Sequence, residues 1–305
     1  MPLTDDLILC TRNRPDDLRR CLASVAAQRR PPSRVLVVDG SDGGETRSLV
    51  ERINREAWLR EPVTLLRTGP GVGAARNLGL RHASRDVVHF LDDDVVLEPG
   101  YFEAIMGVFE DPGRDGVAGV GGVITDLSYP PPTTIERWLM LAGDEGTVLP
   151  SGRIGLIRRP GRPIDVEWLP GCSMSFARSL LPPDPFDARL TRTIEAEDVE
   201  MTYRLSRSGR LVVVPEARLE HHESPIDRHD GLTRTRLELP ARYVRVRRRV
   251  GRLRPAAFWW SAFGQLGYFA ALGVVRRSRF LLRMAGATAL GILDALRLRF
   301  VGPPR

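Results

Sequence analysis

Lysine is absent from the sequence, and cysteine is rare. All 45 basic residues are therefore arginines, which outnumber the 38 acidic residues and give a formal net charge of +7. Cys10, Cys21 and Cys172 are odd in number and show no C-x-x-C spacing, which argues against a disulfide framework and against a structural zinc site. No basic region precedes the first apolar run, so we expect no secretory signal and a cytoplasmic protein.

The residues that are present describe a folded protein with an uneven distribution of charge. With 42% hydrophobic and 27% charged residues, a chain of 305 residues can bury one large core or two modest ones. The net positive charge on its own would suit nucleic acid or an anionic membrane. However, arginines are concentrated in residues 228–255, directly before an apolar stretch, so we expect a membrane surface and no nucleic acid as partner.

Short apolar runs alternate with helix-like segments between residues 7 and 91. The expected strands are residues 7–10, 34–40, 63–68 and 87–91, and the expected helices are residues 15–28, 43–59 and 73–83. This alternation is typical of a mostly parallel sheet flanked by helices, so we predict an α/β fold with a Rossmann-like first half. Ligands of such sheets bind beyond the carboxyl ends of the strands, where polar or glycine-rich segments follow all four expected strands.

The second half of the chain is less regular. We expect a helix at residues 99–110, and an apolar run follows at residues 117–124. Residues 126–165 are rich in proline and glycine, which predicts a loop-rich insertion over the site. A helix that begins at Glu195 and a strand at residues 211–215 are expected to follow.

Two apolar segments lie near the C-terminal end of the sequence. Residues 256–275 form an uncharged run of membrane-spanning length with arginines on both sides, but Gly, Ser and Gln make the run only moderately hydrophobic. A second segment, residues 280–300, carries embedded charges. We therefore expect packed or interfacial helices that contact a membrane peripherally through residues 228–300, and a single membrane span is the alternative.

Three successive aspartates, Asp92, Asp93 and Asp94, follow the expected strand at residues 87–91. Adjacent carboxylates repel one another, so their ionised state requires water, backbone donors or a cation. A D-x-D spacing at a strand end can hold Mg²⁺ or Mn²⁺ and leave coordination sites for phosphate oxygens. A solvated turn explains the same residues, so this motif alone leaves both interpretations open.

Two other strand ends carry residues that suit a nucleotide. Asp39 can accept a hydrogen bond from a base or a ribose, or it can simply cap the next helix. The loop that begins at Gly69 fits G-x-G-x-x-A, the fingerprint of dinucleotide-binding folds, and an acidic cluster follows about 20 residues later. Pro70 and the two preceding strand–helix units argue against a dinucleotide, and Arg76 with backbone amides could equally bind the phosphates of a mononucleotide.

Acidic and imidazole side chains appear again late in the sequence. Glu197 and Asp198 lie in the first turn of an expected helix, where the helix dipole favours acids, but Asp198 could also face the pocket as a general base. His221 and His222 end a strand-like run, and a neutral imidazole there could complete a metal site. Neighbouring surface histidines often have no function, so these residues alone decide nothing.

These motifs follow one another in a distinctive order. TRNRP, VVDGSD, GVGAARN, FLDDD, WLPGCSMSF, EAED and P-x-A-x-x-x-H-H occur in turn along residues 5–225. In this order they resemble the family 2 glycosyltransferases of the GT-A fold. The resemblance implies a GT-A domain at residues 1–227, with a nucleotide-binding half at residues 1–98 and an acceptor half at residues 99–227. Residues 228–305 would then form a helical C-terminal extension.

The resemblance also implies roles for single residues. The nucleotide would be bound by Thr11, Arg12, Asp39, Arg76, Asp92 and Asp93. The donor sugar and the acceptor would be contacted by Gly171, Cys172, Ser173 and Glu197. A Mg²⁺ or Mn²⁺ ion would be held by Asp92, Asp94 and His221, with His222 as the alternative histidine. Asp198 would be the catalytic base.

The implied reaction is an inverting, metal-dependent transfer of one sugar from a UDP-, GDP- or dTDP-type donor to a hydroxyl of a glycan or lipid-linked acceptor. Asp198 would remove the proton of the attacking hydroxyl, while the cation and Arg76 would offset the charge of the diphosphate leaving group. The Q-x-x-R-W motif of processive members is absent, so we expect a single transfer. The basic and aromatic C-terminal region suggests an enzyme of cell-envelope polysaccharide synthesis at the inner face of the plasma membrane.

Three alternatives use the same residues differently. A Rossmann NAD-dependent oxidoreductase would use the loop at Gly69 for its dinucleotide and would not depend on a metal. A phosphatase of the haloacid-dehalogenase type would use Asp92 as nucleophile, but such enzymes usually need a downstream lysine. A non-catalytic nucleotide-sugar binding protein would keep Asp94 and would dispense with Asp198.

Overall fold

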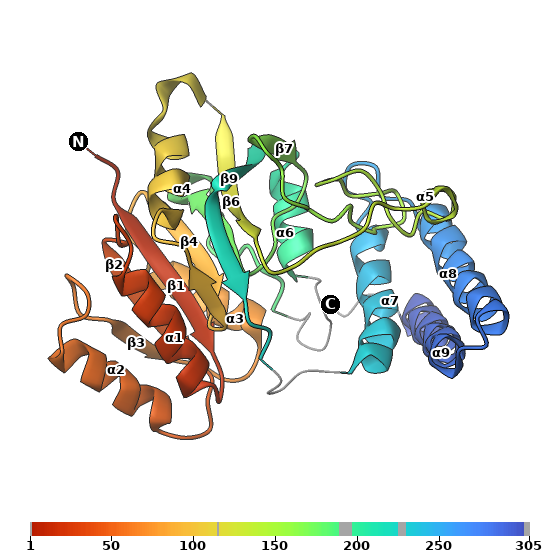
Figure 1. Ribbon diagram of the computed structural model, residues 1–305, viewed down its shortest axis with the longest axis horizontal. Helices are drawn as coiled ribbons and strands as arrows, with labels where there is room; N and C mark the ends of the chain where they lie inside the picture. Colours follow the sequence, from red (N-terminus) through yellow and green to blue (C-terminus); the bar gives the residue numbers. More distant parts are fainter. Residues whose placement is uncertain (1, 115, 189–196, 225–229, 302–305) are drawn as a thin grey trace. The chain divides into compact units, whose positions relative to one another are not determined.

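The computed structural model describes residues 2–114, 116–188, 197–224 and 230–301, which form two compact units (Figure 1). The first unit takes the described residues of Met1–Tyr129, Ile157–Thr191 and Glu197–Asp227, and the second takes those of Pro130–Leu156 and Arg228–Arg305. The functional boundaries expected at residues 98 and 227 stay predictions. The boundary at residue 227 and the helix start expected at Glu195 lie outside the described residues.

The first half of the first unit has the expected alternation of strands and helices. Its strands are β1 (Asp5–Thr11), β2 (Arg34–Asp39), β3 (Thr64–Arg67) and β4 (Val87–Asp92), and its helices are α1 (Pro15–Ala26), α2 (Glu45–Arg55) and α3 (Val72–His82). The four strands are parallel and lie in the order β3-β2-β1-β4. The prediction of parallel strands with intervening helices is therefore confirmed.

The second half adds mostly antiparallel strands to the same sheet, whose full order is β3-β2-β1-β4-β8-β6-β9-β5, with β7 paired to β9. The added elements are β5 (Val95–Leu97), α4 (Tyr101–Glu110), a 3-10 turn (Pro112–Arg114), β6 (Val117–Ile124), β7 (Ile164–Val166), β8 (Met174–Ala177), a 3-10 turn (Arg178–Leu180), α6 (Glu197–Leu205) and β9 (Arg210–His221). Strand β9 is longer than the strand expected at residues 211–215. Because β9 reaches His221, it pairs with β5 beside the aspartates, with Val95 opposite His221.

Side-chain alternation along the central strands explains why helices cover both faces of the sheet. In β1, Leu7 and Leu9 join a core cluster with Leu22 of α1, whereas Ile8 joins another cluster with Leu80 of α3. All of these side chains are fully buried. A central strand that is apolar at successive positions is typical of a sheet with both faces covered.

The register of the parallel strands lines up their polar ends. Thr11 is paired with Asp39, Asp39 with Arg67, and Cys10 with Asp92. These residues occupy the carboxyl ends of neighbouring strands, where α/β sheets bind ligands. The fold therefore gathers the motifs of the first half along one edge of the sheet.

The second unit is helical. It contains α5 (Thr134–Trp138), α7 (Gly231–Arg247), α8 (Pro255–Val275) and α9 (Arg279–Val301). Helix α5 lies within the segment expected as a loop-rich insertion, and a capping box between Thr133 and Glu136 starts it. Residues 130–156 belong to this unit because polar side chains fix them there: the hydroxyls of Ser151 and Ser261 both donate to the Met140 carbonyl. Within the described residues, none of the helices combines the length and the hydrophobicity needed to cross a membrane.

Candidate active site

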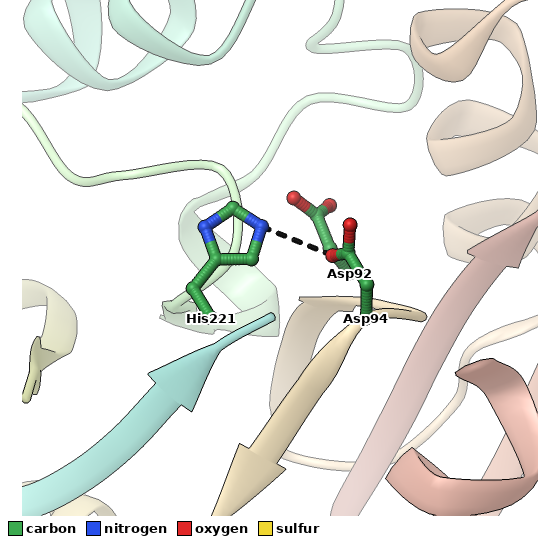
Figure 2. Close-up of side chains that lie close together, drawn as sticks. All are labelled: Asp92, Asp94 and His221. Carbon is green, nitrogen blue, oxygen red and sulfur yellow. Dashed lines mark hydrogen bonds and ion pairs between the residues drawn. The ribbon is translucent and has the colours of Figure 1, made fainter. Parts of the chain in front are cut away.

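Two aspartates and a histidine meet at the carboxyl end of β4 (Figure 2). Asp92 ends β4, Asp94 lies in the turn to β5, and His221 ends β9. Ligand atoms of all three lie within 4.8 Å of one another, and His221 Nε2 is 3.0 Å from Asp94 Oδ1. The structure thus brings together the residues predicted to bind the cation, here named the Asp92–Asp94–His221 cluster.

The local interactions favour the charged forms of two members of this cluster. Burial alone would raise the pKa of Asp94, but hydrogen bonds from His221 and from the Ser224 amide outweigh it and hold this pKa well below its usual range. Burial alone would lower the pKa of His221, but its hydrogen bonds with Asp94 and Cys172 raise this pKa to about 11. Carboxylate oxygens with an imidazole suit Mn²⁺ or Mg²⁺, although the imidazole must lose its proton to coordinate a cation.

His222 points to a different partner. Its Nε2 is 3.0 Å from Glu220, and its side chain is 46% exposed. Only its backbone amide contacts the aspartates, donating to the Asp94 carbonyl at 2.9 Å. Of the two neighbouring histidines, His221 is therefore the one whose imidazole joins the cluster.

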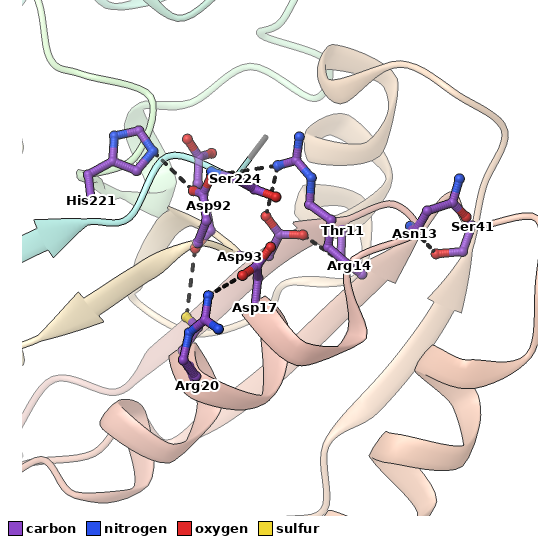
Figure 3. Close-up of polar contacts among 12 residues, drawn as sticks. Thr11, Asn13, Arg14, Asp17, Arg20, Ser41, Asp92, Asp93, His221 and Ser224 are labelled. Carbon is purple, nitrogen blue, oxygen red and sulfur yellow. Dashed lines mark hydrogen bonds and ion pairs between the residues drawn. The ribbon is translucent and has the colours of Figure 1, made fainter. Parts of the chain in front are cut away.

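The middle aspartate is held from the opposite side (Figure 3). Asp93 is 3% exposed, accepts a hydrogen bond of 2.6 Å from the Thr11 hydroxyl, and lies 3.4 Å from Arg14 Nη1. Burial raises the pKa of Asp93 to about 7, against the lowering effects of Thr11 and Arg14. The same Nη1 is 3.6 Å from Asp94 Oδ2, so Arg14 offsets charge on two of the three aspartates.

Two residues predicted to contact the nucleoside, Arg12 and Asp39, lie in different surroundings. Arg12 is exposed and lies 3.6 Å from Asp42. Asp39 is fully buried: its carboxylate accepts a hydrogen bond of 2.8 Å from the Ser41 amide and forms an ion pair with Arg67. The Arg67 side chain is 43% exposed. Arg67 is therefore the member of this pair that reaches solvent, while the role of Asp39 in base recognition stays a prediction.

Arg76 of α3 connects the cluster with the later acidic motif. Its side chain is 4% exposed, with Nη1 3.0 Å from Glu197 and Nη2 3.1 Å from Asp92. Nη2 also donates to the Gly171 carbonyl at 3.2 Å. Burial alone would lower the pKa of Arg76, but Asp92 and Glu197 outweigh it and raise this pKa above its ordinary value. Arg76 therefore stays charged and ties β4 to α6.

The acidic pair at the start of α6 is fixed by backbone donors. The carboxylate of Asp198 accepts from the Gly171 amide at 2.9 Å and from the Val199 amide at 2.8 Å, and Asp198 is 9% exposed. Burial and, after it, the charge of Asp198 raise the pKa of Glu197 to about 7, against the effect of Arg76. A Cβ on Gly171 would lie 2.9 Å from both Arg76 Nη2 and Asp198 Oδ2, so a glycine allows this close approach.

Cys172 and Ser173 support this loop from inside. The Ser173 side chain is fully buried, and its hydroxyl is 2.6 Å from the Tyr101 hydroxyl and accepts from the Gly122 amide at 2.8 Å. Cys172 is 4% exposed and is hydrogen-bonded to His221. Their predicted contacts with the donor sugar or the acceptor stay predictions, because both side chains face protein atoms in this structure.

Comparison with known families identifies the chain. The model of the family described as glycosyl transferase family 2 matches residues 6–169, which is more than half of the sequence. The chain belongs to glycosyl transferase family 2. The match covers the strands that carry Thr11, Asp39 and the three aspartates of this family 2 glycosyltransferase, and it confirms the predicted family.

Two curated relatives resemble part of the glycosyltransferase. The succinoglycan biosynthesis protein ExoM of Rhizobium meliloti (strain 1021) is 30% identical over 158 residues, which cover 50% of this chain and 48% of ExoM. An N-acetylglucosaminyltransferase of Bradyrhizobium elkanii is 28% identical over 116 residues, which cover 37% of this chain and 62% of the relative. The match thus spans about half to three fifths of the length of these relatives.

A solved structure supports the fold over a longer range. The mannosyltransferase PcManGT from Pyrobaculum calidifontis, solved in complex with GDP-Man and Mn²⁺, superposes with a TM-score of 0.60 at 19% identity. The match covers 97% of this chain and 88% of PcManGT. The predicted GT-A fold of the family 2 glycosyltransferase, with its C-terminal helices, is confirmed.

Sequence reasoning did not single out Arg14 and Arg67. Arg14 lies in the segment that follows β1, and Arg67 ends β3, so both occupy strand ends of the kind already expected to bind ligand. Only their position at strand ends could have indicated these two residues. Their residue type could not, because the chain has no lysine and arginines occur throughout it.

Proposed function

We propose that this family 2 glycosyltransferase transfers one sugar from a nucleotide-sugar donor to a hydroxyl acceptor, with inversion and with dependence on a divalent cation. The supporting observation is the link that Arg76 makes between Asp92 of the cluster and Glu197 beside Asp198. One buried arginine thus contacts both Asp92 of the predicted cation site and Glu197, the neighbour of the predicted base.

The donor end of the proposed site has the residues for a nucleoside diphosphate and a cation. Asp92, Asp94 and His221 would hold Mg²⁺ or Mn²⁺, and the fit rests on their converging oxygen and nitrogen atoms. A bound cation would supply positive charge against the diphosphate leaving group. Mn²⁺ accompanies GDP-Man in PcManGT, which supports a divalent cation for this chain without distinguishing Mn²⁺ from Mg²⁺. Thr11, Arg12, Asp39 and Asp93 would line the nucleotide.

The acceptor end performs the proton transfer. We assign Asp198 as the base that takes the proton of the acceptor hydroxyl while that oxygen attacks the anomeric carbon. The bond from the anomeric carbon to the diphosphate oxygen breaks in the same step, so the configuration inverts and no covalent glycosyl-enzyme forms. The hydrogen bond from the Gly171 amide orients the Asp198 carboxylate, and Glu197 would approach the sugar hydroxyls.

The acceptor is proposed by class. ExoM is named as a succinoglycan biosynthesis protein, which supports a cell-envelope polysaccharide or its lipid-linked precursor as acceptor. We therefore also propose that the enzyme works at the inner face of the plasma membrane with peripheral contact through residues 228–300. The family match counts against an NAD-dependent oxidoreductase and against a non-catalytic binding protein, and the experiments below include NAD as a control.

Ligand-induced stabilisation tests the donor class. Thermal unfolding of the wild type and of Asp94→Ala is followed with UDP, GDP, dTDP or NAD, each with Mn²⁺, Mg²⁺ or EDTA. A nucleotide at about 100 times its Kd stabilises the native state by about 2.7 kcal/mol, which raises the midpoint by roughly 5 °C or more. We expect one nucleoside diphosphate to stabilise the wild type only with metal, and Asp94→Ala to lose this effect. Stabilisation by NAD regardless of metal would overturn the proposal.

Asp198→Asn tests the chemistry separately. Loss of a general base typically costs about 10²–10⁴-fold in rate, and we expect sugar transfer to fall within this range. Stabilisation by the nucleotide with metal should be retained, because Asp198 is assigned to the acceptor and not to the nucleotide. Undiminished transfer by Asp198→Asn would remove this residue from its role as base.

A further inference from the structure

Exposed apolar side chains are concentrated in the second unit. Among the described residues, thirteen large hydrophobic side chains are exposed, and eleven of them belong to this unit. Monomeric proteins rarely expose large contiguous apolar surface, and such surface marks contact sites for proteins or membranes. The second unit therefore exposes most of the large apolar side chains that are exposed in the described residues, as expected of a surface that contacts a protein or a membrane.

The two most exposed of these side chains, together with Phe280, lie where α8 turns into α9. Val275 is 78% exposed, Val274 is 69% exposed, and Phe280 is 57% exposed. Helices α8 and α9 lie side by side (Figure 1), and a Cβ on Gly273 would be 2.7 Å from Leu282, so the two helices are in close contact at this turn. We name residues 274–283 the hairpin tip.

The hairpin tip is also strongly cationic. Its arginines, all exposed, are Arg276, Arg277, Arg279 and Arg283. Residues 239–293 contain eleven arginines and no aspartate or glutamate. The tip therefore combines apolar side chains with four arginines, of which Arg283 interacts with the charge of Asp230, and this is the composition of an interfacial membrane anchor.

A second apolar site, at the other end of α8, has a different character. Trp138 and Trp260 pack edge to face at 4.8 Å, and Trp260 Nε1 donates to the Trp138 carbonyl at 3.0 Å. Near it, Asp144 forms an ion pair with Arg137, and Glu136 of α5 accepts a hydrogen bond from the Tyr268 hydroxyl of α8. These tryptophans pack on each other, although Trp138 is 65% exposed, whereas the hairpin tip presents Val274, Val275 and Phe280 among arginines.

We propose that the hairpin tip docks on an anionic lipid bilayer, with Val274, Val275 and Phe280 entering the boundary between headgroups and acyl chains. The four arginines contact headgroup phosphates. Two copies of the tip facing each other would bring eight arginines together, so charge repulsion disfavours a second copy of this chain as the occupant. The proposal specifies the membrane contact of the proposed function and rests on it for the presence of a membrane-bound acceptor.

The measurement is co-sedimentation of the full chain with vesicles of phosphatidylcholine alone or with one third phosphatidylglycerol, at low and high salt. Each arginine near an anionic surface contributes about 1 kcal/mol, so Arg276→Gln with Arg277→Gln should weaken binding about 30-fold. Binding should also fall in high salt and on vesicles without phosphatidylglycerol. Equal binding to both vesicle types would overturn the proposal.

A matched pair of phenylalanines locates the contact. Phe280 at the tip is 57% exposed, and Phe263, about 18 Å from Val275 along α8, is 56% exposed. Phe280→Ser should weaken vesicle binding several-fold, and Phe263→Ser should leave it unchanged. The reverse result, or a dimer of the wild type that Phe280→Ser dissociates, would overturn the assignment of the tip to lipid.

Nucleotide-induced stabilisation separates this proposal from the proposed function. Phe280→Ser and the arginine variant should keep the metal-dependent stabilisation by the nucleoside diphosphate, because the tip contributes nothing to the donor site. Loss of vesicle binding with retained stabilisation supports both proposals. Retained vesicle binding with retained stabilisation overturns only the docking proposal, whereas a wild type that no nucleoside diphosphate stabilises counts against the proposed function.

Discussion

Two buried arginines, one in each unit, have opposite surroundings. Arg76 is 4% exposed and Arg242 is 1% exposed, and each guanidinium lies over a phenylalanine ring, at 5.5 Å from Phe186 and 5.1 Å from Phe258. Arg76 contacts two carboxylates and a carbonyl oxygen. The Nε and both Nη atoms of Arg242 have no hydrogen-bond partner in the described part of the chain.

The difference shows how burial acts on a charge with and without compensation. Glu238, the acid nearest to Arg242 at 3.4 Å, also forms an ion pair with Arg153 at 3.1 Å. Burial lowers the pKa of Arg242 to about 9, and the attraction of Glu238 is opposed by the repulsion of Arg153 and Arg245. Arg242 still stays charged at neutral pH, so its burial costs stability, whereas Arg76 is stabilised where the site uses it.

Removing Arg76 should have the largest effect on stability. Arg76→Met leaves Asp92 and Glu197 without their shared counter-charge, and breaking a buried pair costs about 3–5 kcal/mol. Urea denaturation should show this loss in the free energy of unfolding. Arg76→Lys keeps the charge but cannot bridge both carboxylates, so an intermediate value is expected. Wild-type stability in Arg76→Met would mean that the two carboxylates do not depend on this arginine.

Filling the space beside Arg76 should impair activity more than stability. In Gly171→Ala the new Cβ would lie 2.9 Å from Arg76 Nη2 and Asp198 Oδ2, so both groups must move. Displacement of a catalytic group by about 1 Å can cost about 10²-fold in rate, and we expect a fall of that size in the turnover of sugar transfer. Gly231→Ala, at the open start of α7, is the control. Equal turnover in Gly171→Ala and Gly231→Ala would contradict the assignment of Asp198 and Arg76 to the active site.

A pH series should reveal the raised pKa of Glu197, whose charge Arg76 compensates only in part. The pKa of Glu197 rises from 4.5 in the unfolded chain to about 7 in the fold, so between these values the unfolded chain binds fewer protons. Stability must then fall as the pH rises from about 4.5 to about 7. Glu197→Gln has no carboxyl group to titrate here, and it keeps a hydrogen-bonding group for Arg76. Its stability relative to wild type should therefore rise between about pH 4.5 and about pH 7. A pH-independent difference in urea midpoints would argue against the raised pKa.

The smallest effect is expected at Arg242, and with the opposite sign. Arg242→Met removes a buried charge and keeps apolar contact with Phe258, and such replacements can stabilise by about 1 kcal/mol or more. Glu238→Gln is the matched control and should destabilise, since it leaves three arginines without their shared acid. Thermal unfolding distinguishes the two signs. A destabilised Arg242→Met would show that this arginine is compensated like Arg76.

Prediction from the sequence succeeded where the pattern was local. The strands β1 to β4 are apolar runs between helix-like segments, so their succession along the chain and the gathering of Asp39 and the aspartates at one edge were predictable. His221 and Asp198 were singled out through the order of motifs, because no local pattern distinguishes them from other histidines and aspartates, and their roles stay predictions. The geometry that joins them was not predictable, since Arg76 and Glu197 are 121 residues apart.

The second unit shows why other features of the structure could not be predicted from the sequence. Residues 130–156 have weak periodicity, and the contacts that fix Met140 come from Ser151 and from Ser261, far along the chain. The failure to pick out Arg14 has a similar cause, because its partner Asp93 lies 79 residues away. Residue type gave no guidance, since arginine is the only strongly basic residue in the sequence.

The pairing of β9 with β5 also sets an order of events during synthesis. His221 is 127 residues beyond Asp94, which corresponds to roughly 6–25 s of translation at about 5–20 residues per second. During that time the nascent chain holds three neighbouring aspartates, and Arg14 and Arg76 are counter-charges that it already contains. A ribosome-bound chain that stops before β9 therefore lacks the imidazole of the cluster, however completely β1 to β4 have paired.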